Sequence, residues 1–103
     1  MSLGFGVIDS SEIKTQFTDE CRKNLIYYWA KDGKLYGDGR GVIKKKGKTN
    51  MKAGNLVEMS VSLQAGYVAW FIDGMKEESY YMDKLKDQDI KWVPYIIMTF
   101  NGD

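Results

Sequence analysis

The chain has 103 residues, 44 % of them hydrophobic and 14 % aromatic, and this composition argues against an intrinsically disordered chain. Its length suits one domain and excludes a two-domain enzyme. The net charge of +1 is unevenly distributed, because residues 31–52 carry eight Lys or Arg against two Asp and the remaining residues therefore sum to −5. With no histidine and one cysteine, Cys21, the sequence excludes a Ser-His-Asp or Cys-His nucleophile, a zinc site built from Cys and His, and an intrachain disulfide.

Strands separated by glycine turns are the dominant pattern, and the first predicted strand is Gly4–Ile8. A polar stretch, Asp9–Asn24, follows it, and three apolar residues in this stretch recur at helical spacing. A short amphipathic helix capped by Ser10 or Ser11 satisfies this spacing, and so does a long surface loop held to the core by the same side chains. The three apolar residues are Ile13, Phe17 and Cys21.

Asp-Gly pairs divide the next part of the chain into short strands. The segment Leu25–Ala30 is aromatic and β-branched, which favours a strand. Asp32-Gly33 and Asp38-Gly39 predict chain reversals after it, because these dipeptides suit tight hairpin turns. The returning strands are Lys34–Tyr36 and Gly41–Lys44. The run Lys44–Lys48 and the residues Thr49–Ala53 predict an exposed loop.

The second half of the sequence predicts a meander of longer strands. Leu56–Leu63 alternates with period two, with Val57, Met59, Val61 and Leu63 on one face, as in a half-buried strand. Tyr67–Ile72 returns with its own apolar face, and Asp73-Gly74 predicts a two-residue hairpin turn. The remaining predicted elements are the strand Met75–Tyr81, one helical turn within Asp83–Asp89, and the strand Trp92–Phe100, whose Pro94 belongs at an edge or a bulge.

Several strands with turns this frequent indicate an all-β sandwich or barrel. Catalytic groups are scarce, because the adjacent carboxylates of Glu77 and Glu78 point to opposite faces of a strand. The glycine-rich run Gly37–Gly41 lacks the strand-to-helix context of a phosphate-binding loop. We therefore expect a protein that is not an enzyme and that uses no metal or cofactor.

The stretch Gly54–Gly74 resembles the signature of the SPRY family, in which two strands bounded by glycines end in an Asn-Gly hairpin. Gly54 and Gly66 stand at the matching glycine positions, Trp70 or Phe71 at the aromatic position, and Asp73-Gly74 replaces Asn-Gly. Three further segments are similar to family motifs in the same order. They are Gly4–Ile8, Tyr27–Gly41 with its D-G-K-x-Y turn region, and Trp92–Tyr95 around Pro94.

The resemblance implies a bent, antiparallel two-sheet β-sandwich of the concanavalin or jelly-roll-like SPRY type, formed by residues 1–103 as a single domain. The family pattern also contains a strand pair before the first strand seen here and a closing strand after the last. We therefore expect a truncated domain that is closed by its own segment 9–24, completed by a homodimer through uncovered strand edges, or excised from a larger protein. Of these, we favour pairing of edges.

The resemblance further implies a protein-protein interaction module that binds a peptide or protein partner through loops at one end of the sandwich. The corresponding loops are 9–24, 31–40, 45–53 and 82–91. Recognition surfaces favour Tyr, Trp and Arg. Several of the aromatic candidates also have a structural explanation, which is that their rings pack into the core or hold a loop against it. The candidate partner-binding residues are Phe17, Tyr36, Arg40, Tyr80, Tyr81 and Trp92.

Two other classes of function remain open. A lectin-like sandwich would bind carbohydrate with Trp and Tyr rings as stacking platforms, and it needs an exposed aromatic ring beside clustered Asn or Asp on one concave face. Burial of Trp29, Trp70 and Trp92 together would exclude it. Weak RNA or anion binding would use Lys44, Lys45, Lys46 and Lys48, with Tyr27 or Tyr28 for base stacking. A solvated hairpin tip explains this lysine run more simply and makes nucleic acid an unfavoured partner. The single cysteine, the lack of a glycosylation sequon and the lack of a long apolar run predict an intracellular protein, cytoplasmic or nuclear, with no membrane partner.

Overall fold

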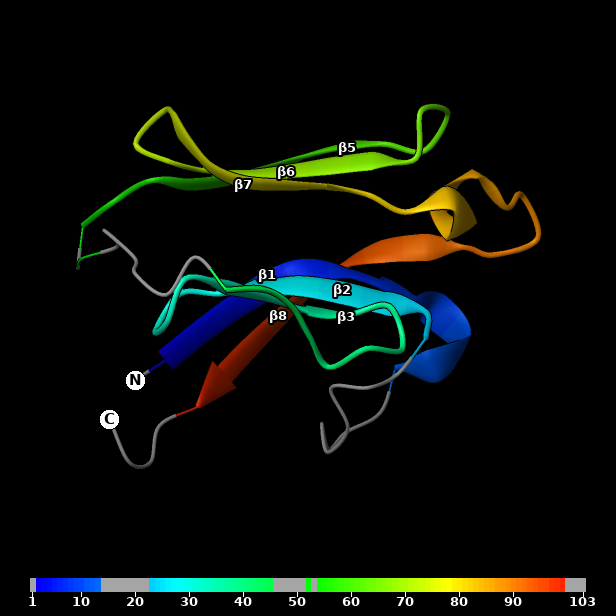
Figure 1. Cartoon of the computed structure of the whole chain (residues 1–103), viewed down its shortest axis with the longest axis horizontal. Helices are drawn as coiled ribbons and strands as arrows, with labels where there is room; N and C mark the ends of the chain where they lie inside the picture. Colours follow the sequence, from blue (N-terminus) through cyan, green and yellow to red (C-terminus); the bar gives the residue numbers. More distant parts are fainter. Residues whose placement is uncertain (1, 14–22, 46–51, 53, 100–103) are drawn as a thin grey trace.

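The computed structural model describes residues 2–13, 23–45, 52 and 54–99. In these residues the chain forms two antiparallel sheets that face each other as two layers (Figure 1). The larger sheet has the order β4-β3-β2-β1-β8, and the smaller sheet has the order β5-β6-β7. The strands are β1 (Ser2–Asp9), β2 (Leu25–Trp29), β3 (Lys34–Gly37), β4 (Val42–Lys45), β5 (Val57–Ser62), β6 (Tyr67–Ile72), β7 (Met75–Tyr81) and β8 (Trp92–Thr99).

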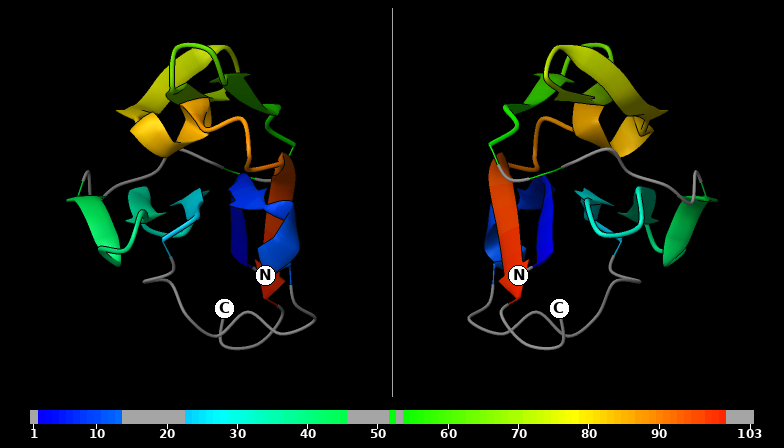
Figure 2. Two further views of the ribbon diagram at one scale, coloured as in Figure 1. Left: turned by 90° about the vertical axis from the view of Figure 1, so that its right-hand side faces the viewer. Right: turned by 90° about the vertical axis from the view of Figure 1, so that its left-hand side faces the viewer.

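The all-β sandwich predicted from the sequence is confirmed, and each predicted strand is present within two residues of its expected bounds. Two short 3₁₀ helices complete the described elements, η1 (Ser10–Glu12) and η2 (Asp83–Lys86). The second confirms the helical turn expected within Asp83–Asp89. In the end-on views of Figure 2, β5 lies over the side of the larger sheet formed by β1 and β8.

The main hydrophobic core lies between the two sheets. The alternating residues Val68, Trp70 and Ile72 of β6 are buried against it, as their spacing predicts. The larger sheet contributes the facing residues Phe5 and Tyr28, whose rings meet edge to face with centroids 5.9 Å apart. The indole nitrogen Nε1 of Trp70 donates a hydrogen bond of 2.7 Å to the carbonyl of Phe5, so β6 is joined directly to β1 in the opposite sheet.

The larger sheet is apolar on both of its faces. Ile8, Leu25 and Tyr27 are buried in a second cluster, separate from the one between the sheets. The Tyr27 ring stacks on Tyr36 with centroids 5.3 Å apart, and Trp29 meets Tyr27 edge to face. Consecutive burial of this kind explains why the predicted strand Leu25–Ala30 reads as an unbroken apolar run rather than an alternating one.

The Asp-Gly pairs form the tight turns expected of them. In the β6–β7 turn, Asp73 and Gly74 have φ angles of 51° and 82°, which is the left-handed pair that a two-residue hairpin of this type requires. The Asp73 carboxylate also accepts hydrogen bonds from the Leu56 backbone N–H at 2.8 Å and from the Asn55 side chain. The turn residue therefore fixes both its own hairpin and the chain that leads into β5.

The start of the polar stretch after β1 does not form the helix capped by Ser10 or Ser11, which was one of its two predicted structures, and residues 14–22 lie outside the described residues. Neither Ser10 nor Ser11 caps a helix, because the carboxylate of Asp9 caps η1 by accepting from the Ser11 N–H. Ile13 is already extended, so the described part of this stretch holds a single 3₁₀ turn rather than an amphipathic helix through Ile13. Phe17 and Cys21 lie outside the described residues.

Pro94 lies on β8, which is an edge strand of the larger sheet, as predicted. On β5 the expected apolar face is only partly covered. Val57 and Met59 pack against the core, whereas Val61 and Leu63 are exposed because β5 is also an edge strand. The alternation in the sequence thus gave the correct face, and the position of the strand decides how much of that face is buried.

We expect Gly6→Ala to destabilise the protein by at least about 3 kcal/mol, because overpacking against main chain cannot be relieved by a side-chain rotation. A Cβ atom at Gly6 would stand 1.8 Å from the Ile26 carbonyl oxygen, which is held in the β1–β2 ladder. The matched control is Gly4→Ala, whose Cβ would meet the half-buried ring of Trp29 at 2.6 Å and should cost about 1 kcal/mol. If urea unfolding showed the same decrease in the free energy of unfolding for Gly6→Ala and Gly4→Ala, this account of β1 would be contradicted.

We expect Trp70→Phe to lower the free energy of unfolding by about 2–3 kcal/mol, because it leaves the buried Phe5 carbonyl without this donor and opens a small cavity. Trp92→Phe is the control, since Trp92 is half-buried and donates a longer bond of 3.3 Å to the Lys84 carbonyl. We expect Trp92→Phe to lower the free energy of unfolding by only about 1 kcal/mol. Thermal and urea unfolding of both variants would measure the difference, and a larger loss for Trp92→Phe would contradict the role given to Trp70.

Candidate functional site

Four chain connections meet at one end of the sandwich, at the right of Figure 1, and we call this region the loop end. It contains η1 with residues 23 and 24, the β3–β4 turn, the β5–β6 turn, and η2 with the residues that lead into β8. The predicted loops 9–24 and 82–91 both contribute to it. The predicted loop 31–40 does not act as one unit, because β3 separates its two turns and only the turn at 38–41 reaches the loop end.

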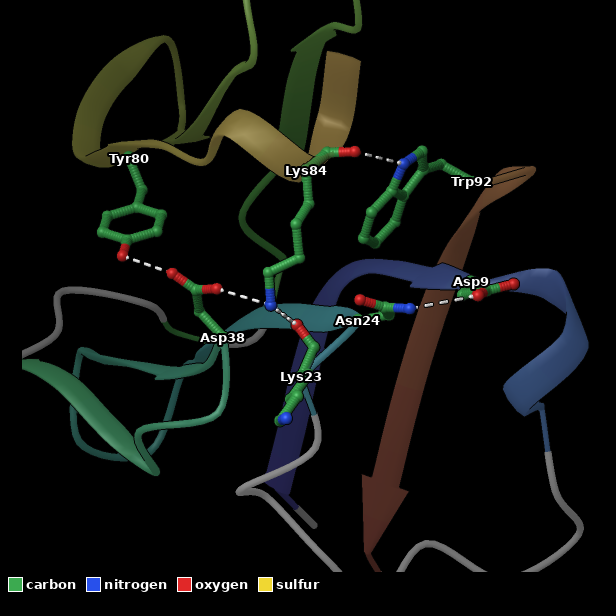
Figure 3. Close-up of polar contacts among 7 residues, drawn as sticks. All are labelled: Asp9, Lys23, Asn24, Asp38, Tyr80, Lys84 and Trp92. Atoms are coloured by element: carbon green, nitrogen blue, oxygen red, sulfur yellow. Dashed lines mark hydrogen bonds and ion pairs between the residues drawn. The ribbon is translucent and has the colours of Figure 1, made fainter. Parts of the chain in front are cut away.

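The Asp38 carboxylate is the centre of the polar contacts at the loop end (Figure 3). It accepts a hydrogen bond of 2.7 Å from the Tyr80 hydroxyl and forms an ion pair of 2.9 Å with the Lys84 ammonium group. Lys84 also donates to the main-chain carbonyl of Lys23. These contacts join the β3–β4 turn of one sheet to β7 and η2, which belong to the other layer.

The local sequence explains how Asp38 comes to lie there. Asp38 and Gly39 have φ angles of 51° and 73°, and the turn is closed by hydrogen bonds between Gly37 and Gly41 and from Arg40 to Gly37. Asp tolerates the left-handed conformation better than most residues. The run Gly37–Gly41 is therefore a hairpin turn that presents a carboxylate, which is the opposite of what a phosphate-binding loop needs.

Tyr80 is one of two groups at the loop end whose pKa is shifted, and the other is Asp9. Burial raises the pKa of its hydroxyl, and the hydrogen bond to Asp38 and the negative charge of Asp38 raise this pKa further, while Arg40 opposes the change. The neutral phenol is thus the form that the folded protein favours. At neutral pH Tyr80 acts as a hydrogen-bond donor and not as a base.

Asp9 and Asn24 join the two sides of the neighbouring connection. The Asp9 carboxylate accepts from the Ser11 N–H at 2.9 Å, from the Ser11 hydroxyl at 2.8 Å and from the Asn24 amide at 3.3 Å. These donors lower the pKa of Asp9, the Ser11 N–H having the largest effect, so its carboxylate stays ionised. The contacts fix where the chain leaves β1 and where it re-enters β2.

A hollow of about 630 Å³ opens at the loop end between the β5–β6 turn and the chain around η2. Its wall combines apolar side chains with groups of both charges and two amides, which is the mixture a peptide-binding surface uses. Leu63 is 46 % exposed and also lines a smaller, adjoining hollow with Trp92. The lining residues of the larger hollow are Leu63, Gln64, Leu85, Lys86, Asp87, Gln88 and Ile90.

Four of the six predicted partner-binding residues lie at the loop end. Tyr81 is 71 % exposed and packs beside Tyr67 with ring centroids 4.6 Å apart. Arg40 is exposed in the β3–β4 turn. Tyr80 and Trp92 are half-buried, and their polar atoms are used within the domain, on Asp38 and on the Lys84 carbonyl. The structure thus leaves Tyr81 and Arg40 as the more accessible members of this set.

The other predicted residues are not brought to the loop end. Tyr36 lies in the second apolar cluster, stacked on Tyr27, with its hydroxyl donated to Asp32. Phe17 lies outside the described residues, as do Lys46 and Lys48 of the predicted anion-binding set. Lys44 and Lys45 belong to β4, an edge strand of the larger sheet, so the described part of the lysine run is strand rather than loop.

The sequence did not reveal the groups that meet at the loop end. Period-two alternation predicts a buried Leu63, and its exposure follows from the edge position of β5. In the sequence, Lys86 of the hollow's wall and the neighbouring ion pair of Asp38 and Lys84 have no motif that marks them. Their proximity depends on how the two sheets are stacked, which no local pattern records.

None of the three tryptophans offers an exposed ring of the kind a carbohydrate would stack on. Trp70 is fully buried, and Trp29 and Trp92 are half-buried. In the described part of the chain, no group of three or more Cys, Asp or Glu residues could hold a metal ion.

Comparison with known proteins adds no family. No family model, no curated protein and no solved structure matches the chain. Across the described ranges, no helix has the length and apolar character needed to cross a membrane.

We expect the stability of the native protein to fall more steeply with pH than that of Tyr80→Phe once the pH rises above about 10, the ordinary pKa of tyrosine. The sign follows from the raised pKa of Tyr80: its contribution to stability is complete below the pKa of the unfolded chain and is lost as the pH rises through the folded value. Urea unfolding between about pH 8 and pH 11 would measure both slopes. The other tyrosines are common to both proteins, so parallel curves would contradict the raised pKa.

Proposed function

We propose that this chain is a non-catalytic protein-interaction domain of the SPRY type, which binds a peptide segment of a protein partner at the loop end. The observation that carries the proposal is the 630 Å³ hollow at this end, with Leu63 exposed in its wall. Binding sites for partners are concave, largely apolar and edged by a few polar groups that orient the ligand. The absence of histidine from the whole sequence supports recognition over catalysis.

The framework around the hollow supports the same proposal. Asp38, Tyr80 and Lys84 tie the β3–β4 turn to η2, and η2 supplies part of the hollow's wall. A surface held by such contacts loses little conformational entropy when a partner binds. Arg40 and Tyr81 belong to residue types enriched among interface hot spots, and both remain accessible at this end.

The SPRY assignment itself is supported by the order of motifs along the chain together with the sandwich architecture. The segment from Gly54 to Gly74 contains β5, β6 and the Asp73-Gly74 turn, which is the arrangement that the family signature describes. Loops at one end of the sandwich form the recognition surface implied by that resemblance. The proposed site uses the same kind of surface.

A phage-displayed random peptide library, panned on the purified chain, would test the proposed function. We expect enriched peptides whose affinity drops about tenfold or more for Leu63→Asp and for Tyr81→Ala, because truncating a central contact costs more than about 1 kcal/mol. The matched control is Met75→Asp, which changes an exposed apolar residue at the opposite end of β7, its first residue. Thermal unfolding would verify that all three variants remain folded.

Two results would reject the proposal. One is the absence of any enriched peptide, and the other is a set of peptides whose affinity is unchanged by both loop-end variants. Glycan-array binding that depends on Tyr81 would replace the proposal with the lectin-like alternative. Binding of single-stranded RNA that weakens steeply with salt would replace it with the lysine-run alternative.

A further inference from the structure

The edges of the two sheets differ in how well they are protected from pairing with another chain. In the described part of the chain, each of β4, β8, β5 and β7 is paired along one side only. The sequence of β7 contains Lys76, Glu77 and Glu78, and that of β4 contains Lys44 and Lys45. Charged residues of this kind commonly protect an edge strand from association, because pairing would bring them close to a second chain.

The edge strand β8 lacks this protection. Its eight residues, Trp92–Thr99, include no charged side chain, whereas β5 carries the exposed Glu58. Ile96 and Met98 of β8 are 64 % and 54 % exposed, so apolar surface accompanies the uncharged edge. A long, apolar and uncharged edge is the feature by which strands recognise other strands.

The phase of the main-chain groups on β8 can be derived from its pairing. The Lys91 carbonyl accepts from the Ser10 N–H, so Lys91 and every second residue after it direct their polar groups toward β1. The intervening residues Trp92, Pro94, Ile96 and Met98 direct theirs to the outer edge. Pro94 supplies no N–H there, which leaves Ile96 and Met98 as the uninterrupted donors and acceptors of this edge.

Next to this edge lies an apolar groove of about 170 Å³ between the two sheets. It is formed where the edge strands β5 and β8 lie on the same side of the sandwich (Figure 2). Ile96 takes part in its wall together with Val57 and Met59 of β5. A strand added beside β8 would extend this wall and cover side chains that are now exposed.

We propose that two copies of this chain associate through antiparallel pairing of β8 with β8, about a two-fold axis at Ile97. Ile96 of one copy then lies opposite Met98 of the other, and their N–H and C=O groups form the central hydrogen-bonded pairs on both sides of the axis. Pro94 falls outside these central pairs. The pairing joins two five-stranded sheets into one continuous sheet.

Two properties of the edge favour a second copy as the occupant. Antiparallel pairing about a two-fold axis is self-complementary, so each edge presents the donors and acceptors that its copy needs. Two copies of an edge without charge also pair without electrostatic repulsion. Two copies of β4 or of β7 would instead bring like charges together, because their sequences contain charged residues. The inference does not rest on the proposed peptide-binding function, because Ile97 is five residues, about 17 Å of extended strand, from Trp92 at the loop end.

Sedimentation velocity across the micromolar range would test the association. We expect a concentration-dependent dimer that is weakened at least tenfold by Ile96→Lys and by Met98→Lys, because each places two like charges beside the axis. Met75→Lys is the control, since Met75 is 68 % exposed on a strand of the other sheet, and it should leave the dimer unchanged. A monomer at all concentrations, or a dimer unaffected by both β8 variants, would overturn the proposal.

A cross-linking experiment tests the register and does not depend on charged substitutions. In a Cys21→Ser background, Ile97→Cys places two thiols directly opposite each other across the axis, at the Cα separation of about 4.5 Å expected for a non-hydrogen-bonded pair, which suits a disulfide. We expect a disulfide-linked dimer on mild oxidation. Val93→Cys, four residues away on the same face of β8, is the control, and cross-linking that is equal for both variants would overturn the register.

Discussion

The hydrogen bond from the Trp70 indole to the Phe5 carbonyl is the contact on which the arrangement of the two layers depends. Each sheet on its own is held by local strand pairing, and every described ladder joins strands of one sheet. Trp70 is fully buried and stacks on Tyr28 with ring centroids 6.4 Å apart. Its indole N–H, the one polar group of the side chain, donates to a carbonyl of the opposite sheet. Because an indole is both large and a directed donor, it sets the separation and the offset of the layers together.

That offset decides where the surfaces of the molecule are found. With β6 stacked over the larger sheet, the end of β7 and η2 come to lie over the β3–β4 turn, and Asp38 can reach both Tyr80 and Lys84. The same offset places β5 above β8 and leaves a groove between these two edges. The proposed binding site and the proposed dimer contact are therefore two consequences of one stacking arrangement. They lie toward opposite ends of β8, so the second copy would leave the loop end open.

Sequence reasoning predicted the strands well and the site only in part. Period-two alternation on Val68, Trp70 and Ile72 identified the core face correctly, because alternation records which side of a strand is covered. The same rule was incomplete for Leu63, since an edge strand has less protein above it than its pattern assumes. Tyr36 is a candidate for partner binding within a predicted strand, and the structure places its ring on Tyr27 in the second apolar cluster. Both outcomes have one cause, which is that the exposure of a side chain depends on neighbours distant in sequence.

The sequence by itself determined the strand segments, the Asp-Gly turns between them and the absence of histidine chemistry. These are properties of single residues and of their immediate neighbours, so they can be read without knowing the fold. The tertiary structure alone decided the order of strands in each sheet, the stacking held by Trp70 and the meeting of Asp38 with Tyr80 and Lys84. Such contacts join residues up to 65 positions apart, and their energies arise only when two separately formed sheets pack together.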